Sequence, residues 1–512
     1  MTRLNSYHLI TLLYIFYISD QISTNNLSYD DNRCGSLHSS PSVCDAKRSQ
    51  YYWHSKEKIS PSCWGYEHGC HNHKRPFCEK NAFKSERNRN RSLSRFWTSV
   101  DFGLVSQLRE SFLTLCEPRD EFGSSLVCTP NMQYCRARNL YVDFSVYNFK
   151  THNRFHKIPF QKGQIGGHCK LNVDLLRAQN GYKVNLGTWY SELEDYSELS
   201  FHPEERCDEV VRKPTIFMKL DDPGNMFHHF CDFINLFISQ HVNGSYSFKD
   251  EDSVIRDVNM IHWSSSSNLY LDTIFGETWK VFTNSHLQQI SNFIGKRVCF
   301  HDVVFSMPPR NPSALYYNSR FPEGCHTSQL VRAFSKRVLE GLQVNRRTSD
   351  LHEIKVTFLS RSTKFRRVVN EGYLVSAAEK MGNVSVTLID YNWREMSFLQ
   401  QLEMTVNTDI LIGMHGAGLT HFMFLPPWAV GFELFNCEDA GCYKDLAALS
   451  GIKYMTWEDH SKFEAVEKSS DSELRHDPKF WNYSFDVDEF LRLLRRSVDY
   501  VKMNRPVSRE YN

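Results

Sequence analysis

Between residues 354 and 503 the sequence alternates between short apolar runs and longer segments with helical periodicity. The apolar runs, which are the predicted strands, are IKVTFLS, VSVTLID, TDILIG, VGFELF and KYMTW. Helices are predicted for NEGYLVSAAEKMG, MSFLQQLEM, GLTHFMFL, DLAAL and VDEFLRLLRRSVDYVKM. Strands that alternate with helices form a parallel sheet whose two faces are covered by helices. The sequence therefore predicts an α/β fold for this half of the chain.

The same kinds of element are predicted further upstream, at wider spacing. KPTIFMKL (213–220) and VCFHDVVF (298–305) are predicted strands, and helices are predicted over 225–243 and 326–344. DDPGN, a turn and helix-start signal, follows the first of these strands. A chain of 512 residues is too long for one ordinary core, so two or three domains are expected.

The N-terminus has the order of charged, apolar and polar residues that is typical of a secretory signal. Arg3 precedes YHLITLLYIFYIS, which is too short to span a bilayer comfortably and is followed by polar residues. We predict a signal peptide over 1–23; the alternative is an ordinary buried segment. No later apolar run approaches the roughly 18 residues of a membrane-spanning helix, so no membrane span is expected.

Cysteines and glycosylation sequons also favour the secretory pathway. Of the 15 cysteines, ten precede residue 210, and in an oxidising compartment that density predicts disulfides of unknown pairing. Five Asn-x-Ser/Thr sequons are candidate glycosylation sites: Asn26, Asn90, Asn243, Asn383 and Asn482. The formal net charge of +1 gives no reason to expect a nucleic-acid partner.

The segment 21–100 has few periodic apolar patterns and is predicted to be loop-like. Its basic run RNRNRSLSR (87–95) is interpreted as a solvated loop rather than a binding patch. CWGYEHGCHNHKRPFC (63–78) mixes Cys and His, which leaves zinc as an alternative. Because the stretch has no CxxC pair and the compartment favours disulfides, disulfides are the preferred interpretation.

The predicted helix 225–243 carries a polar stripe beside its apolar one. His228, Asp232 and Asn235 lie at i, i+4 and i+7, and His229 lies on a neighbouring edge. A His–Asp pair near the start of a helix that follows a strand can hold or orient a general base. The alternative is an ordinary ion pair on a solvated face.

IGMHGAGLTH (412–421) has the pattern of a strand, a tight turn and a helix. Gly416 and Gly418 allow a sharp turn and the close approach of a ligand, and His415 can add a hydrogen bond or a charge. The helix start offers unpaired N–H groups to an anion. The stretch lacks the third glycine of a dinucleotide fingerprint and the Gly-Lys-Ser/Thr of a P-loop. A phosphate contact is the preferred interpretation, and a plain turn is the alternative.

Further polar residues lie at the ends of other predicted strands. Arg361 and Arg366 come after IKVTFLS, and Glu433 lies within VGFELF. Ligands of open α/β sheets bind at the carboxyl ends of the strands. Together these features predict a nucleotide-diphosphate site. The arginines would bind the diphosphate, beside the turn that contains Ala417, Leu419 and Thr420. The glutamate would bind ribose hydroxyls.

Long stretches of this chain resemble glycosyltransferase family 61. The resemblance is carried by MKLDDPGNMFHHFCDFINLFISQHVNGS, RSTKFRR, DILIGMHGAGLTHFMFLP and FELFNCEDAGCYKDLA. LVCTPNMQYCRARNLYVDF, GQIGGHCKL and DPKFWNYSFDVDEF extend it over most of residues 60–490. The resemblance implies a GT-B-type fold, in which two Rossmann-like domains face a cleft.

The resemblance also implies an activity and roles for the residues named above. The activity is inverting transfer of N-acetylglucosamine from UDP-N-acetylglucosamine to Ser or Thr of folded EGF-like repeats, in extracellular proteins such as Notch-type receptors. Asp232 with His228 or His229 would take the hydroxyl proton. Arg361 and the 415–420 turn would hold the departing UDP.

Domain boundaries follow from combining these patterns with the resemblance. After the signal peptide, we expect a Cys-rich region over 24–204 that packs partly on the first Rossmann-like domain. That domain, on the acceptor side, is expected over 205–315, and the second, on the UDP-sugar side, over 316–505.

The chain also departs from the family pattern at two places. Relatives carry an Asp-x-Asp triplet where this chain has Asn284, Ser285 and His286, so no metal cofactor is expected. The chain ends SREYN rather than in a KDEL-like signal, although the endoplasmic reticulum lumen is the expected location. The alternative functions are a sister family-61 transferase with another acceptor, such as an O-mannose extender, and a non-catalytic lectin-like or chaperone relative.

Overall fold

In the computed structural model, the chain divides into two compact units, Met1–Ser55 and Lys56–Asn512. The described residues all belong to the second unit and are 64–66, 76–145, 160–181, 184, 186–245, 255–263, 274–311, 321–347, 353–434, 441–468 and 476–506. The predicted signal peptide, Asn26 and most of the Cys/His stretch 63–78 lie outside these ranges. In the ranges that are described, no helix combines the length and apolar character needed to cross a membrane.

The C-terminal half contains the predicted parallel sheet. Its five strands lie in the order β15 (Val384–Ile389), β14 (Ile354–Leu359), β16 (Ile410–Gly413), β17 (Val430–Glu433) and β18 (Lys453–Thr456). Every neighbouring pair is parallel. The alternation of strands and helices in the sequence is therefore confirmed, and the observed bounds differ from the predicted ones by a few residues.

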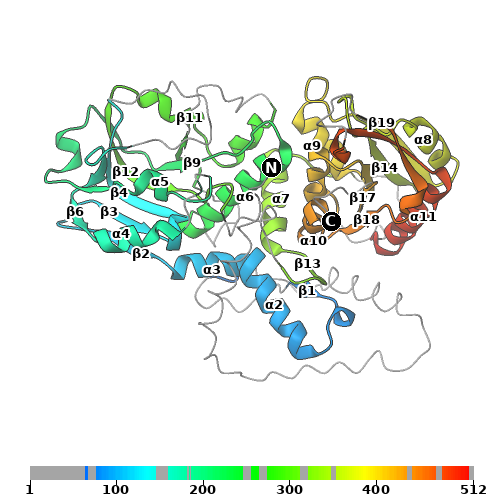
Figure 1. Ribbon diagram of the computed structural model, residues 1–512, viewed down its shortest axis with the longest axis horizontal. Coiled ribbons are helices and arrows are strands. Elements are labelled where there is room, and N and C mark those ends of the chain that lie inside the picture. The colour runs from blue at the N-terminus through cyan, green and yellow to red at the C-terminus, as the bar shows by residue number, and fades with distance from the viewer. Residues whose placement is uncertain are drawn as a thin grey trace. The chain divides into compact units, whose positions relative to one another are not determined.

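Helices cover both faces of this sheet (Figure 1). One face packs against α8 (Glu371–Glu379) and α11 (Val487–Asn504) in a core built around Phe358, Phe432 and Phe490. The other packs against α7 (Gln329–Gly341), α9 (Phe398–Val406), α10 (Gly441–Ser450) and the 3-10 helix η7 (Ala417–Phe424). A local sequence signal marks the start of α9, where Ser397 and Gln400 form a capping box.

The described part of the N-terminal half contains an eleven-stranded mixed sheet. Its main path is β11 (Gln288–Gln289), β10 (Asn259–His262), β9 (Thr215–Met218), β12 (Arg297–Phe305), β4 (Cys135–Asp143), β3 (Ser125–Cys128), β2 (Leu113–Pro118) and β6 (Cys169–Leu171). The strands from β11 to β12 are parallel, whereas β4 runs antiparallel to β12. Strands of the Cys-rich region therefore continue the sheet of β9 and β12, and the expected domain boundaries stay predictions.

Helix α6 (Met226–Asn243) follows β9 and packs on this sheet through a stripe of aromatic side chains. Asn225 caps its first turn, and Gly244 ends it with φ 77°, in the left-handed region that glycine adopts at little cost. Phe230, Phe233 and Phe237 lie in a core cluster that also contains Phe334 of α7 and Leu419 of η7. A shared core thus joins α6 to the helices on one face of the smaller sheet.

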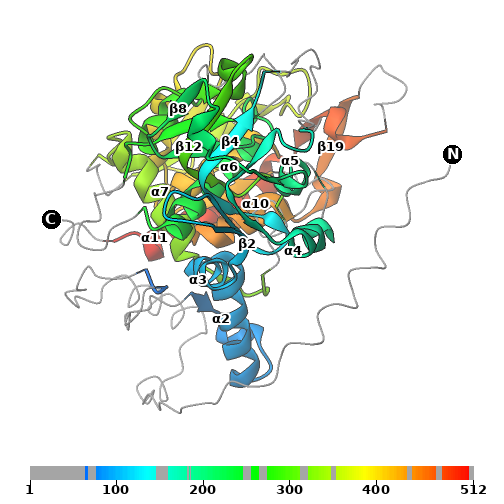
Figure 2. The same ribbon diagram turned by 90° about the vertical axis from the view of Figure 1, so that its left-hand side faces the viewer.

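The prediction of a loop-like segment over 21–100 is wrong at its C-terminal end. Residues Glu86–Val100 form helix α2, and Phe102–Glu110 form helix α3 (Figure 2). Helix α3 packs on α6. Ser85 caps α2 at its first turn, and the helix buries Phe96 and Val100. Tertiary packing of these two side chains outweighs the weak helical signal of the Arg- and Asn-rich face.

Four disulfides join described cysteines, as the cysteine density predicted. They are Cys78–Cys325, Cys116–Cys169, Cys128–Cys135 and Cys207–Cys299. Cys78 closes the Cys/His stretch that had left zinc as an alternative, and it is bonded to Cys325 between β1 (Phe77–Cys78) and β13 (Cys325–His326). A disulfide therefore uses the one cysteine of that stretch that lies in the described ranges.

Candidate functional site

The carboxyl ends of three strands of the smaller sheet bring the predicted donor residues together. Leu359 of β14 pairs with Gly413 of β16, and Gly413 pairs with Glu433 of β17. Arg361 follows the first of these strands by two residues, and His415 follows the second by two. Parallel strands in this register place the segments that follow them at one edge of the sheet.

Two guanidinium groups converge on the backbone carbonyl of His415. Arg361 donates to this oxygen from Nη1 across 3.4 Å, and Arg366 donates from its own Nη1 across 3.0 Å. Burial and the charge of Arg366 lower the pKa of Arg361 to about 10, so Arg361 remains a cation at neutral pH. Neither has a carboxylate within 4.0 Å among the residues that the structure describes. Two adjacent cations without a carboxylate partner form a site for an anion.

The loop that carries Arg366 is fixed by β20 (Trp481–Phe485). The N–H of Arg366 donates to the carbonyl of Trp481 across 2.7 Å. Asn482 Nδ2 donates to the carbonyl of Lys364, and Asn482 Oδ1 accepts from the N–H of Arg367. These contacts hold Arg366 at φ 58°, an uncommon conformation for a residue with a side chain.

Gly416 lies against the guanidinium of Arg361. A Cβ atom at this position would lie 2.3 Å from Arg361 Nη1, so any larger residue would displace the guanidinium from its observed position. Helix η7 begins at the next residue, Ala417, and Ala417 and Gly418 are both partly exposed. The start of the helix and the two arginines thus face one region.

Leu419, Thr420 and His421 point into the core instead. Leu419 and Thr420 are fully buried, and the Leu419 side chain lies under Gly413. Burial lowers the pKa of His421 to about 4, and its ring packs on Tyr391. Leu419 and Thr420 were predicted to contact the sugar donor. In the structure, their side chains pack in the core instead.

Glu433 lies behind His415 rather than at the surface. Its Oε1 is 2.6 Å from His415 Nδ1, and its Oε2 accepts from the hydroxyl of Tyr454, also across 2.6 Å. The residue is 1% exposed. Both carboxylate oxygens already have protein partners, which does not fit the expected contact with ribose hydroxyls. Glu433 instead orients His415 through this contact at Nδ1.

At the start of α6, His228 pairs with Asp221 and not with Asp232. His228 Nδ1 lies 3.0 Å from Asp221 Oδ2, and Arg310 reaches the other oxygen of Asp221 across 3.1 Å. Burial alone would raise the pKa of Asp221, but His228 and Arg310 together hold it below its ordinary value. The side chain of His228 is 26% exposed, and that of Asp221 is 3% exposed. This is a carboxylate that orients an accessible imidazole.

His229 and Asp232 form a separate, buried pair. His229 Nδ1 lies 3.5 Å from Asp232 Oδ2, which also accepts the N–H of Asp221 across 3.2 Å. Burial lowers the pKa of His229 to about 3, and its ring packs on Phe233 and Trp279. The predicted stripe placed His228 and Asp232 together. In the structure, Asp232 instead holds the backbone that carries Asp221.

Aromatic rings connect the two clusters. The ring of His415 lies 5.0 Å from that of Tyr443, which lies 5.7 Å from the ring of Phe227. Phe227 contacts the ring of His228 at 5.7 Å. The arginine cluster and the His228–Asp221 pair are therefore neighbours, although they come from opposite halves of the chain.

Asp221, Arg310 and Tyr443 were not among the predicted site residues. Asp221 lies in DDPGN, which was interpreted only as a turn, and Arg310 lies in a proline-rich break. The position of Asp221 in the sequence could have indicated its role, because it directly follows a strand that leads into the helix of the predicted base. At the missing Asp-x-Asp triplet, Ser285 Oγ accepts from Lys213, and no carboxylate stands in the triplet itself.

The chain is similar to known proteins over most of its length. A model of the family described as Glycosyltransferase 61 matches residues 226–431, a range that includes α6, Arg361 and the glycine turn. A Xenopus laevis protein named EGF domain-specific O-linked N-acetylglucosamine transferase is 44% identical over 445 residues, which is 86% of this chain and 83% of the relative. Proteins of the same name from Gallus gallus and Drosophila melanogaster are 42% and 38% identical, over 90% and 89% of this chain and 86% and 87% of their own lengths.

Proposed function

The chain belongs to glycosyltransferase family 61, and we propose that it transfers N-acetylglucosamine from UDP-N-acetylglucosamine to Ser or Thr hydroxyls of folded EGF-like repeats. The names of its relatives support the sugar and the class of acceptor. The observation that carries the proposal is the convergence of Arg361 and Arg366 on the carbonyl of His415. It provides positive charge where a diphosphate leaving group would need it.

On the donor side, Arg361 and Arg366 would bind the diphosphate of UDP. Arginine is suited to this task because its N–H donors match phosphate oxygens. His415, held by Glu433, would donate to the diphosphate from Nε2 as negative charge grows on the departing UDP. The two guanidinium groups and the His415 imidazole would supply the stabilisation that a divalent metal provides elsewhere, so we propose transfer without a metal cofactor.

On the acceptor side, His228 would take the proton of the attacking hydroxyl. Asp221 would orient the imidazole and stabilise the imidazolium that forms. Asp232, the base expected from the sequence, would instead maintain the position of Asp221. Direct attack of the hydroxyl opposite the departing UDP inverts the anomeric centre.

We further propose a GT-B-type arrangement and a place of action in the endoplasmic reticulum lumen. Two α/β sheets that contribute neighbouring clusters support the arrangement. The four disulfides support an oxidising compartment, and so do the relatives, whose names specify EGF domains.

The test is a transfer assay with the full chain, UDP-N-acetylglucosamine and a folded EGF repeat, run with EDTA and with manganese. We expect transfer to the folded repeat in EDTA and little transfer to the reduced repeat. Binding of UDP is measured separately by calorimetry. UDP binding without transfer to any EGF repeat would favour a non-catalytic relative. Transfer to another glycoprotein acceptor alone would favour a sister transferase, and transfer only with manganese would contradict the metal-free mechanism.

A further inference from the structure

Asp120, His168 and His202 meet on the larger sheet, on segments that the proposed transfer reaction does not use. Their ligand atoms all lie within 4.8 Å of one another. Within the described ranges, this is the one group of three or more His, Cys, Asp or Glu side chains spaced to hold a metal ion. We propose that these three side chains bind a zinc ion and that the site is structural.

The distances suit a shared ion better than direct hydrogen bonds. Asp120 Oδ2 lies 3.4 Å from His168 Nε2 and 3.5 Å from His202 Nε2. A charge-assisted N–H···O bond is shorter, at about 2.7–2.9 Å. Ligands about 2.0–2.2 Å from a tetrahedral zinc ion are about 3.3–3.6 Å apart, which matches the two separations between Asp120 and the histidines. Two imidazoles and one carboxylate also form a ligand set that zinc accepts with water in the fourth position.

Hydrogen bonds orient two of the ligands. His168 Nδ1 lies 3.1 Å from the carbonyl of Leu199, and because a carbonyl only accepts, the proton resides on Nδ1. The lone pair of Nε2 then faces Asp120. Asp120 Oδ1 accepts the N–H of Phe122 across 3.0 Å, which fixes the carboxylate with Oδ2 toward the histidines. Outer contacts of this kind are typical of metal-ligating His and Asp.

The segments that carry Asp120 and His168 are rigid. Asp120 follows β2 and His168 precedes β6, and these strands are paired through Pro118 and Cys169. The Cys116–Cys169 disulfide joins the same two strands. Ser124 adds two hydrogen bonds to the backbone of His168, one at its N–H and one at its carbonyl. The two ligands are therefore held in place before any ion binds.

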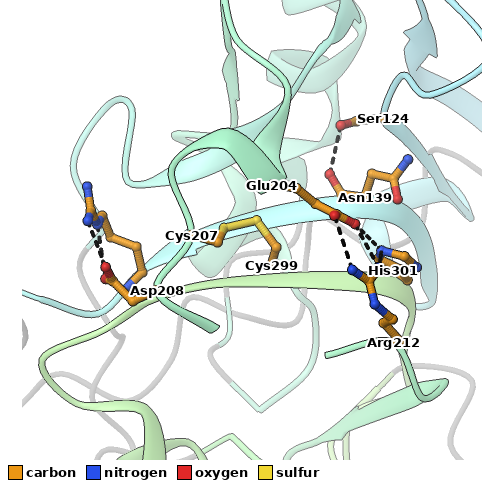
Figure 3. Close-up of a disulfide and its surroundings, with 9 residues drawn as sticks. Ser124, Asn139, Glu204, Cys207, Asp208, Arg212, Cys299 and His301 are labelled. Carbon is orange, nitrogen blue, oxygen red and sulfur yellow. Dashed lines mark hydrogen bonds and ion pairs between the residues drawn. A yellow bond between two sulfur atoms is a disulfide. The ribbon is translucent and has the colours of Figure 1, made fainter. Parts of the chain in front are cut away.

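The chain that follows His202 is anchored to β12 (Figure 3). The Cys207–Cys299 disulfide joins it to this strand, and Glu204 contacts His301 and Arg212 beside the disulfide. On the other side of His202, the N–H of Leu199 donates to the carbonyl of Gly167, next to His168. All three ligands thus stand on segments fixed by disulfides and strand pairing.

The competing interpretation is an ion pair between Asp120 and protonated histidines. The rings of His168 and His202 are 4.3 Å apart, so two imidazolium charges there would repel each other. A metal ion uses both imidazoles in their neutral form and removes this repulsion. The ion-pair interpretation predicts that the chain does not bind one equivalent of zinc, so a zinc titration distinguishes the two interpretations.

The experiment uses the full chain, freed of metal with EDTA and then titrated with zinc chloride. We expect one zinc equivalent per chain and a rise of the melting temperature by about 2 °C or more at saturation. Calcium and magnesium, which prefer oxygen ligands, should give neither effect. Two partly exposed ligands are then replaced separately, as His168→Gln and His202→Gln.

Each variant should lose the bound equivalent and the thermal shift while remaining folded without zinc. His460→Gln, at an exposed histidine outside the group, is the matched control and should bind zinc as the wild type does. Wild-type protein that takes up no zinc overturns the proposal. Uptake that both variants retain overturns it as well, because the ion would then reside elsewhere. UDP binding should stay unchanged in every variant, since the site lies apart from the arginine cluster.

Discussion

Arg361 occupies the space that a side chain at position 416 would need. A Cβ atom on Gly416 would lie 2.3 Å from Arg361 Nη1 and 3.4 Å from the guanidinium carbon. The absence of a side chain at Gly416 therefore lets the Arg361 cation lie directly against the backbone of the turn. The N-terminus of η7 and the guanidinium can then contact the same anion.

Gly416→Ala should weaken UDP binding by about tenfold or more, because it displaces one charged donor to the diphosphate. Isothermal titration calorimetry with UDP measures the effect directly. Gly372→Ala is the matched control, since a Cβ there meets nothing within 4 Å. Equal UDP affinity in the two variants would show that UDP binding does not depend on the observed position of Arg361.

His228→Ala should lower kcat by about 10²–10⁴-fold and leave the Kd for UDP unchanged, as expected for loss of a general base. Asp221→Asn should act in the same direction, because it removes the carboxylate that orients His228. Steady-state transfer rates together with UDP calorimetry separate catalysis from binding.

Asp232→Asn is the informative comparison for the base. An asparagine oxygen can still accept the N–H of Asp221, so turnover should fall less than in His228→Ala. A steeper loss in Asp232→Asn than in His228→Ala would return the role of base to Asp232, the residue that the helical stripe had indicated.

The sequence predicted the smaller sheet well because each of its strands and helices carries a local signal. The apolar runs, the Ser397 cap and the helical periodicity of 487–503 all act within a few residues. Helix α2 was missed because it depends on burial of Phe96 and Val100 by distant segments. Disulfide pairing likewise depends on which strands lie side by side, as in Cys207–Cys299.

The sequence predicted which residues lie in the candidate site, but not which of their side chains pair with each other. Arg361, Arg366 and His415 follow strands of one parallel sheet, and this topology was visible in the sequence. Helical spacing suggested that His228 and Asp232 form a pair. It could not show that the preceding turn brings Asp221 closer, at 3.0 Å from His228.

The free energy of unfolding should fall as the pH is lowered below about 6.5. Burial lowers the pKa of His229 and His262 to about 3, and that of His421 to about 4. The unfolded chain binds a proton at each residue near its ordinary value of 6.5, while the folded chain does not. Acid therefore favours unfolding, by about 1.4 kcal/mol per pH unit for each histidine. Denaturant unfolding between pH 7 and 5 measures the slope.

His421→Gln should reduce this pH slope, whatever its effect on stability at pH 7. Phe398→Leu changes a non-titrating ring that contacts His421, so it serves as the control. It should lower stability at every pH and retain the wild-type slope. An unchanged slope in His421→Gln would mean that the histidine is protonated in the folded chain.

Removal of Cys78–Cys325 should destabilise the fold more than removal of Cys128–Cys135. The first closes a loop with a sequence separation of 247 and the second one of 7. The loop-entropy relation gives about 5 kcal/mol for the longer loop and about 2 kcal/mol for the shorter one. Thermal unfolding of Cys325→Ser and of Cys135→Ser tests the order. The reverse order would show that loop closure does not dominate the contribution of these disulfides.

Asn482 belongs to a sequon, but we expect it to carry no glycan in the folded protein. It is 4% exposed, and its Nδ2 donates to the carbonyl of Lys364. A sugar on Nδ2 would have to enter this buried position and break the contact that fixes the Arg366 loop. Asn90 and Asn383 are exposed and should be the occupied sequons. Mass spectrometry of glycopeptides from secreted, folded protein measures occupancy at each site.

The same contact predicts an effect of Asn482 on the donor site that is independent of glycosylation. Ser484→Ala destroys the sequon and keeps the Asn482 side chain, so it should bind UDP like the wild type. Asn482→Ala destroys both, leaves the N–H of Arg367 without its acceptor, and should weaken UDP binding several-fold through displacement of Arg366. Asn383→Ala, at an exposed sequon, is the control and should leave UDP affinity unchanged. Equal UDP affinity in Asn482→Ala and Ser484→Ala would show that the position of Arg366 does not depend on this contact. A glycan found on Asn482 of active enzyme would contradict the buried placement of Asn482.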